Sequence, residues 1–146
     1  MQRFSVLIEW QNLEEDFAYS SYKREHHLNF SGGQKITNSA AVSYGGDPKA
    51  SNPDELLLAA VSSCHMLTFL AIAAKSRMYI LSYEDQSEAI LQKNEEGITQ
   101  ITKIILKPKI IFKDTEPSAN RLLILHQKAH KHCIIANSIK AKVEVL

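Results

Sequence analysis

The feature that most constrains the fold of this chain is an uncharged, mainly apolar run from Leu56 to Ala74. Folded as a helix, such a run is about as long as the hydrocarbon core of a membrane is thick. However, Asp54 and Glu55 directly precede the run, His65 lies within it, and no second hydrophobic segment or aromatic belt accompanies it. We therefore interpret the run as the central helix of a soluble core, apolar on nearly every side, and we expect no membrane association.

The residues before this run predict where the helix begins. Asn52 can cap the helix, Pro53 suits the first helical position, and Glu55 stands where a capping box requires an acid. The sequence therefore predicts a helix from Pro53 to about Lys75.

The segments on either side of this helix show mainly strand patterns. Phe4 to Trp10 alternates apolar and polar residues, Gly32-Gly33 supplies a reversal, and a long hairpin is expected after the helix. This order predicts an α+β fold with antiparallel sheets packed around a long central helix. We expect one domain over 1–146, with a small sheet in 1–50 and the central helix, hairpin, second helix and final strand in 51–146. The expected strands are 4–10, 19–30, 35–42, 79–91, 98–112 and 140–146, and the second helix is expected over 117–133.

The charge and cysteine content exclude several classes of partner and location. Lys plus Arg number 17 against 16 Asp plus Glu, so no net field attracts nucleic acid or an anionic membrane. Met1 to Trp10 lacks the continuous apolar region of a signal peptide. Two widely separated cysteines without a CxxC motif fit a reducing compartment. We therefore expect a cytoplasmic protein.

Cys64 on the central helix is the first candidate for chemistry. A cysteine among apolar neighbours can simply be a small buried hydrophobe, whereas a reactive one must be held as a thiolate. Cys64 lies about 11 residues into the helix, too far for the dipole of the helix N-terminus to ionise it. A positive charge from elsewhere is therefore expected. The adjacent His65 points away from the sulfur, so it is interpreted as structural or solvent-facing, and Arg24 is the better candidate, with a solvated strand residue as its alternative.

Two segments resemble a known family. Asn52-Pro53-Asp54-Glu55-Leu56-Leu57-Leu58-Ala59-Ala60-Val61-Ser62-Ser63-Cys64-His65-Met66 resembles the OsmC/Ohr helix, which reads Asn-Pro-Glu, then an apolar stretch with small residues, then the peroxidatic cysteine. Cys133-Ile134-Ile135-Ala136-Asn137-Ser138 resembles the second cysteine segment of that family, followed by a final strand. The resemblance spans Asn52 to the C-terminal end of the sequence.

This resemblance implies a thiol peroxidase. The Cys64 thiolate would attack an organic hydroperoxide, and Cys133 would convert the resulting sulfenic acid into a disulfide. An external thiol or dithiol would reduce that disulfide, and no metal, haem or flavin is required. An apolar face around Cys64 suits an organic hydroperoxide. The family resemblance further implies an intertwined homodimer with active sites between subunits.

The family also pairs its cysteine with an arginine from the N-terminal sheet and a carboxylate at the start of the helix. The resemblance assigns Arg24 to the first role, and either Asp54 or Glu55 to the second. Asp54 lies about 15 Å along the helix from Cys64, so it cannot touch the sulfur directly. It must act through Arg24 or across a subunit boundary.

Two alternatives belong to other functional classes. His126, His130 and Cys133 lie at helical spacing on one face, with His132 nearby, which is a spacing that can bind Zn²⁺. A module that keeps the fold but only binds a small ligand is the other alternative, because fold does not determine function.

Overall fold

The central helix α1 spans Pro53–Lys75, which confirms the predicted bounds. Its N-terminus is closed by a capping box, in which Glu55 N donates to Asn52 Oδ1 at 3.0 Å and Asn52 N donates to the Glu55 carboxylate at 3.2 Å. At the other end, Arg77 adopts a left-handed conformation with φ of 57°. Met78 N then donates to Ala73 O, which ends the helix in a Schellman-type turn.

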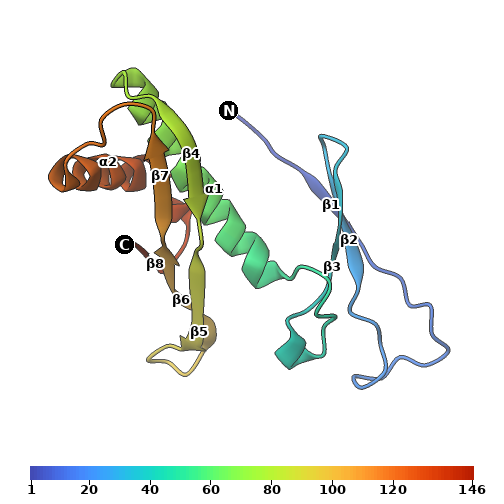
Figure 1. Ribbon diagram of the computed structural model, residues 1–146. Coiled ribbons are helices and arrows are strands. Elements are labelled where there is room, and N and C mark those ends of the chain that lie inside the picture. The colour runs from blue at the N-terminus through green and yellow to red at the C-terminus, as the bar shows by residue number, and fades with distance from the viewer. The chain divides into compact units, whose positions relative to one another are not determined.

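The structure, a computed structural model, describes residues 1–146, and they divide into two compact units (Figure 1). The first unit is Met1–Leu56 and the second is Leu57–Leu146. The boundary falls inside the first turns of α1.

The first unit contains the small antiparallel sheet that the sequence predicts. Its strands β1 (Val6–Glu9), β2 (His26–Phe30) and β3 (Lys35–Asn38) pair in the order β1-β2-β3. Gly33, with φ of 87°, makes the reversal between β2 and β3, where a residue with a side chain would be strained. All three strands are shorter than the segments 4–10, 19–30 and 35–42 in which they were predicted.

The second unit contains the predicted hairpin, but each of its two long strands is divided. β4 (Ile80–Asp85) pairs with β7 (Pro108–Phe112), and β5 (Glu88–Lys93) pairs with β6 (Thr99–Leu106). At the division, Asp85 Oδ1 accepts a hydrogen bond from Lys107 N at 2.7 Å, and Pro108 has no N–H to continue the ladder. The hairpin therefore contributes to two sheets.

The closing strand β8 (Lys142–Val145) confirms the predicted final strand but pairs parallel to β6, giving the order β5-β6-β8. The other strand pairs are antiparallel, as predicted. The exception arises because α2 (Ala119–His132) lies between β7 and β8 in the chain, and a connection of that length can return the chain in the same direction.

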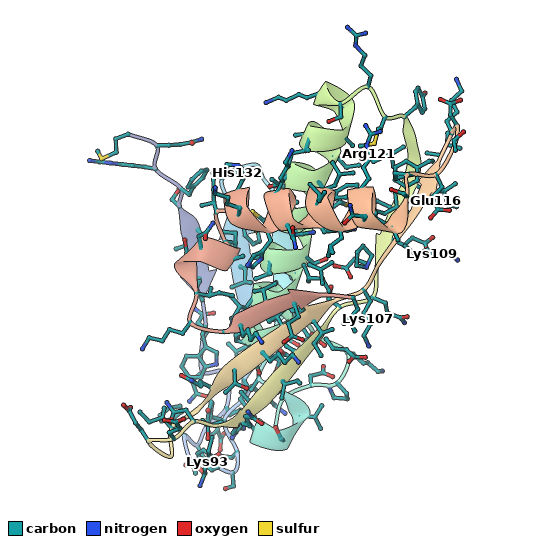
Figure 2. The ribbon with its side chains drawn as sticks, turned by 90° about the vertical axis from the view of Figure 1, so that its left-hand side faces the viewer. Lys93, Lys107, Lys109, Glu116, Arg121 and His132 are labelled. Atoms are coloured by element: carbon teal, nitrogen blue, oxygen red, sulfur yellow. The ribbon has the colours of Figure 1, made fainter.

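Both halves of α1 are packed, each against a different set of elements. The buried residues of α1, at four-residue spacing, are Val61, His65, Phe69 and Ala73. Phe69 and Ala73 form one core cluster with Leu125 and Ala129 of α2, which lies across α1 in Figure 2, with Arg121 and His132 labelled near its ends. Val61 forms the other cluster with residues of the β5-β6-β8 sheet, among them Ile104 and Leu106. This arrangement holds the middle of α1, where Cys64 lies.

The remaining faces of α1 are apolar but largely uncovered within the chain. An 18-residue window has a mean hydropathy of 2.0, yet only 22% of it is buried, and Leu67 is 60% exposed. By its length and composition, α1 is therefore a candidate membrane span. The core helix of a soluble protein can meet the same two criteria.

Candidate thiol site

Cys64 of α1 and Cys133 beyond the end of α2 lie next to each other in the second unit. Their thiol groups share a hydrogen bond, and both cysteines are free. Cys64 is half-buried and Cys133 is fully buried. Two sulfurs that are remote in the sequence are therefore brought together by α1 and by the residue that follows α2.

The chain around Cys133 wraps the sulfur in backbone groups. Cys133 caps the C-terminus of α2 in an extended conformation, and a short 3₁₀ helix, η2 (Ala136–Ser138), follows. Ala136 N donates to Cys133 Sγ at 3.4 Å, and the Asn137 side chain donates to the carbonyl oxygen of Cys133 at 2.9 Å. This tight turn directs the peptide N–H groups that follow Cys133 toward Cys64.

The surroundings of Cys64 favour its thiolate. Partial burial opposes ionisation, but hydrogen bonds from Ile135 N–H, the Cys133 thiol, Ile134 N–H and the Thr68 hydroxyl outweigh it and lower the pKa of Cys64 below its usual 9.0. A thiolate is the form of cysteine that acts as a nucleophile.

The pKa of Cys133 is shifted in the opposite direction. Burial, together with the hydrogen bond that Cys133 donates to Cys64, raises the pKa of Cys133 to about 11, although the Ala136 N–H partly offsets this. The proton therefore stays on Cys133 when Cys64 loses its own. The pair therefore consists of one thiol with a lowered pKa and a neighbouring thiol, with a raised pKa, that donates a hydrogen bond to it.

Arg24 lies in the first unit, where several groups hold its guanidinium. It stacks over the rings of Tyr22 at 4.3 Å and Tyr19 at 5.1 Å. It also donates to the carbonyl oxygens of Tyr22 and Tyr19 at 3.1 and 2.9 Å. Gly45 lies so close that a Cβ there would be 3.1 Å from Arg24 Cζ. Arg24 is therefore an ordered, half-buried cation without a carboxylate partner, rather than a solvated strand residue.

The two candidate carboxylates at the start of α1 differ in whether their side chains are hydrogen-bonded within the chain. Glu55 is exposed and completes the capping box with Asn52. Asp54 is half-buried and its side chain makes no hydrogen bond within the chain. Asp54 is therefore the carboxylate that is free to bind a cation. Both acids belong to the first unit with Arg24, whereas Cys64 and Cys133 belong to the second.

His65 is fully buried and structural. Its Nε2 is 3.1 Å from His126 Nδ1, the planes of the two rings are nearly parallel with centroids 5.4 Å apart, and the Phe69 ring stacks on His126 at 4.5 Å. Burial, with the neighbouring His126, lowers the pKa of His65 to about 4. His65 is therefore neutral near pH 7.

The alternative of a metal site at His126, His130 and Cys133 is not supported by the geometry. No group of three or more His, Cys, Asp or Glu side chains is arranged to hold a metal ion. His126 is turned toward His65, and Cys133, which follows the last helical residue in an extended conformation, is turned toward Cys64. The helical spacing that suggested the site ends one residue before Cys133.

The peptide N–H groups of Ile134 and Ile135 are the part of the site that sequence reasoning missed. They lower the pKa of Cys64, whereas the sequence led us to expect a positive charge in that role. Backbone groups carry no residue signature, and the only signal for them was their position directly after the second cysteine.

Comparison with known proteins identifies the family. The family model described as OsmC-like protein matches residues 46–145. An OsmC-like protein of unknown function from Vibrio cholerae O1 biovar eltor has a solved structure that is 37% identical, covers all of both chains and superimposes with a TM-score of 0.92. The uncharacterized protein YmaD of Bacillus subtilis is 29% identical over 103 residues, which is 68% of this chain and 67% of that protein.

More distant structures show the same fold. The organic hydroperoxide resistance protein OsmC of Legionella pneumophila has a TM-score of 0.71 at 20% identity, covering 99% of this chain and 96% of that one. OhrB of Bacillus subtilis, also an organic hydroperoxide resistance protein, has a TM-score of 0.67 at 18% identity, covering 99% and 98%.

The fold is thus that of the OsmC/Ohr proteins, an α+β fold with two helices and antiparallel sheets, as the sequence predicted. The chain belongs to the OsmC-like family, which includes proteins of hydroperoxide resistance.

Proposed function

We propose that this protein is a cytoplasmic, homodimeric thiol peroxidase that reduces organic hydroperoxides as part of a stress response. The observation that carries the proposal is the contact between Cys64 and Cys133, in which the pKa of Cys64 is lowered and that of Cys133 is raised. That asymmetry separates a nucleophile from a resolving thiol.

In the first step, the Cys64 thiolate attacks the distal oxygen of the hydroperoxide. The O–O bond breaks, the alkoxide leaves and takes up a proton to become an alcohol, and Cys64 becomes a sulfenic acid. The sulfur has then lost two electrons and the peroxide has gained them.

In the second step, Cys133 attacks the sulfenic sulfur. The S–O bond breaks, water leaves, and a Cys64–Cys133 disulfide forms. The two sulfurs already share a hydrogen bond, so only a small movement is required. An external dithiol, or two monothiols, then reduces the disulfide to the two starting thiols.

Arg24 and Asp54 complete the proposed site. A guanidinium stabilises the negative charge on the attacking sulfur and on the leaving oxygen. The Arg24 side chain is an unpaired cation held on aromatic rings, and Asp54 is a carboxylate without a partner, so each is free to enter such a site. Glu55 serves to cap α1.

The homodimer is supported by the uncovered faces of α1. A helix that is apolar all round and only partly buried within its own chain requires further cover. A second copy packed along α1 supplies that cover by a two-fold symmetric contact.

The decisive experiment measures consumption of cumene hydroperoxide with a dithiol reductant. Cys64→Ser is expected to abolish turnover, whereas Cys133→Ser is expected to reduce about one equivalent of peroxide per chain and then stall. Ser63→Ala, at an exposed neighbouring position of α1, is the matched control and should turn over normally. Equal rates in all variants would reject the peroxidase and leave the alternative of a non-catalytic module that binds a small ligand.

A further inference from the structure

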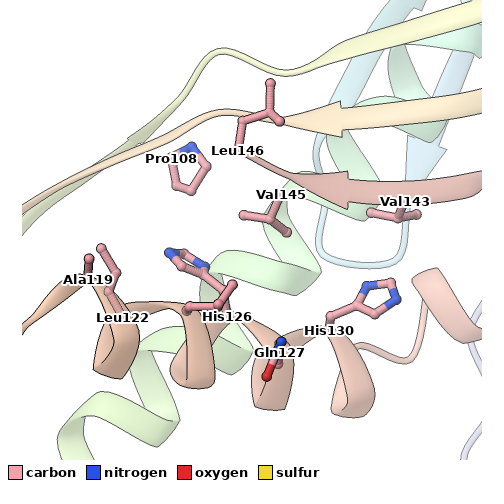
Figure 3. A pocket seen from close by; sticks show the side chains of 10 residues that line it. Pro108, Ala119, Leu122, His126, Gln127, His130, Val143, Val145 and Leu146 are labelled. Carbon is pink, nitrogen blue, oxygen red and sulfur yellow. The ribbon is translucent and has the colours of Figure 1, made fainter.

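The hollows of the two units differ in the side chains that line them. In the second unit, a cavity of about 360 Å³ between α2 and β8 is walled mainly by apolar side chains, with no cysteine and no arginine among them (Figure 3). In the first unit, an open hollow of about 520 Å³ has Trp10, Phe17 and Tyr22 in its wall together with Arg24. The first unit therefore brings aromatic rings and a cation together, which the cavity of the second unit does not.

Tyr22 is the ring that the other aromatic rings of the first unit share as a neighbour. Its centroid lies 5.5 Å from that of Phe17 and 6.4 Å from those of Trp10 and Tyr19. Trp10 Nε1 also donates to the carbonyl oxygen of Lys23 at 2.7 Å, which ties the residue after Tyr22 to Trp10. The Tyr22 ring is therefore held in place by its neighbours.

The guanidinium of Arg24 lies over this ring. Its Cζ is 4.3 Å from the centroid of Tyr22 and 5.1 Å from that of Tyr19, so Tyr22 makes the closer cation–π contact. The carbonyl oxygens of the same two residues accept hydrogen bonds from Arg24 Nη1 and Nη2. A turn in which Tyr22 N donates to Ala18 O brings both residues to the one guanidinium. Its orientation is therefore set by a ring and by two carbonyl groups.

These contacts orient Arg24 without neutralising its charge. A guanidinium has five N–H donors, and the two bonds to carbonyl groups leave three of them without a partner in the chain. No carboxylate forms a salt bridge with Arg24. An aromatic face attracts a cation through its quadrupole and carries no net charge of its own. The positive charge therefore remains available to a thiolate or to a leaving oxygen.

We propose that Tyr22 is a positioning residue of the peroxidase, whose ring holds the Arg24 guanidinium in the orientation that the reaction uses. The inference rests on the proposed function, because Tyr22 acts only through Arg24. A charged group that is already oriented need not reorganise when charge develops in the transition state. The inference also gives the aromatic rings around Tyr22 a role, since they keep that ring beneath the cation in a unit that buries little apolar surface.

The test begins with three single substitutions in the assay with cumene hydroperoxide and a dithiol. Tyr22→Leu removes the ring and should lower kcat/KM about tenfold, as expected for a partly desolvated cation–π contact. Tyr22→Phe keeps a ring and should stay within about twofold of wild type. Tyr79→Leu is the matched control, because it removes the ring of the second unit that lies 4.7 Å from Lys113 Nζ, and it should turn over normally.

A double substitution tests whether Tyr22 acts through Arg24. In the Arg24→Gln background, Tyr22→Leu should cause no further loss of kcat/KM, because the ring then has no cation to hold. A ring that only stabilised the fold would lower kcat/KM by the same factor in both backgrounds. Equal losses in the two backgrounds would therefore overturn the inference, and so would a loss in Tyr22→Phe as large as that in Tyr22→Leu.

NMR of the ¹⁵N-labelled full-length protein gives a readout that does not depend on turnover. The Nε–H signal of Arg24, identified by its loss in Arg24→Gln, should lie upfield of solvated arginines, because the Tyr22 ring current shields it. Tyr22→Leu should move this signal downfield, and the same spectra show whether each variant is folded. An unmoved signal, or wild-type kcat/KM in Tyr22→Leu, would overturn the role of Tyr22. Absence of turnover in the wild type would instead reject the proposed function itself.

Discussion

The two units of this chain differ in how much of their apolar surface they bury. The second unit contains both core clusters, built around Phe69 and Val61. In the first unit every residue of β1 is exposed, and Trp10 and Phe17 pack against each other yet remain 42% and 67% exposed. A unit of this size encloses little core, so its stability depends on contacts from outside itself.

The difference has a consequence for the proposed site. Cys64 and Cys133 sit in the well-packed unit, and the groups that lower the pKa of Cys64 sit there too. Arg24 sits in the poorly covered unit. The thiol pair therefore lies in a unit with a core of its own, whereas the proposed cation belongs to the unit that buries little apolar surface.

Hydrogen exchange should show the largest contrast between the units. At submicromolar protein concentration, the amides of β1 are expected to exchange on the order of 1,000-fold faster than those around Phe69, because opening β1 exposes little buried surface. Mass spectrometry of exchanged peptides measures this. If a second copy of the chain covers β1, the exchange of the β1 amides slows as the protein concentration rises. Equal protection of β1 and α1 at every concentration would contradict the comparison.

Matched Phe→Ala substitutions test the same contrast in stability. Phe69→Ala removes a fully buried ring and should lower the free energy of unfolding by about 3–5 kcal/mol. Phe17→Ala removes an exposed ring of the first unit and should lower it by about 1 kcal/mol or less. Urea denaturation measures both, and similar losses would mean that the first unit has a core of its own.

Arg24→Gln separates the contribution of the cation from that of the thiol pair. We expect kcat/KM for cumene hydroperoxide to fall about 100-fold, because transition-state charge loses its partner. The pKa of Cys64 should remain below its usual value, since the hydrogen bonds that lower it come from the second unit. Alkylation rates as a function of pH report that pKa, and its return to 9.0 or above would show that Arg24 is needed for ionisation.

The buried His65 should make the second unit sensitive to acid. Unfolded His65 takes up a proton near pH 6.5, but the folded protein resists until about pH 4. Between these values the unfolded state binds more protons, so stability falls as the pH falls from 6.5 to 4, by on the order of 2 kcal/mol. His65→Leu should flatten this dependence in urea titrations at several pH values. If the stability of His65→Leu changes with pH as steeply as that of the wild type, other groups cause the pH dependence.

Thr68→Val should have the smallest effect. It removes the hydroxyl that donates to the carbonyl oxygen of Cys64 at 2.8 Å and contributes least to lowering the pKa of Cys64, while keeping the shape of the side chain. The thiolate fraction at pH 7 should fall, and the rate of the peroxide step should fall about threefold, as expected for one weak hydrogen bond. Stopped-flow measurement of a single turnover detects this, and a rate equal to that of wild type would remove Thr68 from the site.

Local signals in the sequence predicted the elements better than their pairing. The capping residues and the apolar run located α1, and alternation located the hairpin and the closing strand. The division of the hairpin at Asp85 and Pro108, and the parallel pairing of β8, were missed. Strand direction depends on the path of the chain through α2, which no local pattern encodes.

In the candidate site, too, local sequence signals predicted some features correctly and others wrongly. The apolar stretch around Cys64 and the segment after Cys133 carry recognisable residues, so the family could be identified from the sequence alone and both cysteines could be chosen as candidates. The apparent metal face at His126, His130 and Cys133 was misleading, because helical spacing no longer applies once the helix ends at His132.

The sequence by itself determined the central helix, the α+β class and the family, and it made the two cysteines the candidates for chemistry, because these depend on local periodicity and on residue identity. Only the tertiary structure decided that Ile134 and Ile135 present their N–H groups to Cys64, and that His65 pairs with His126. These are contacts of backbone groups and of residues distant in the chain, and their geometry exists only after α1, α2 and the sheets have packed.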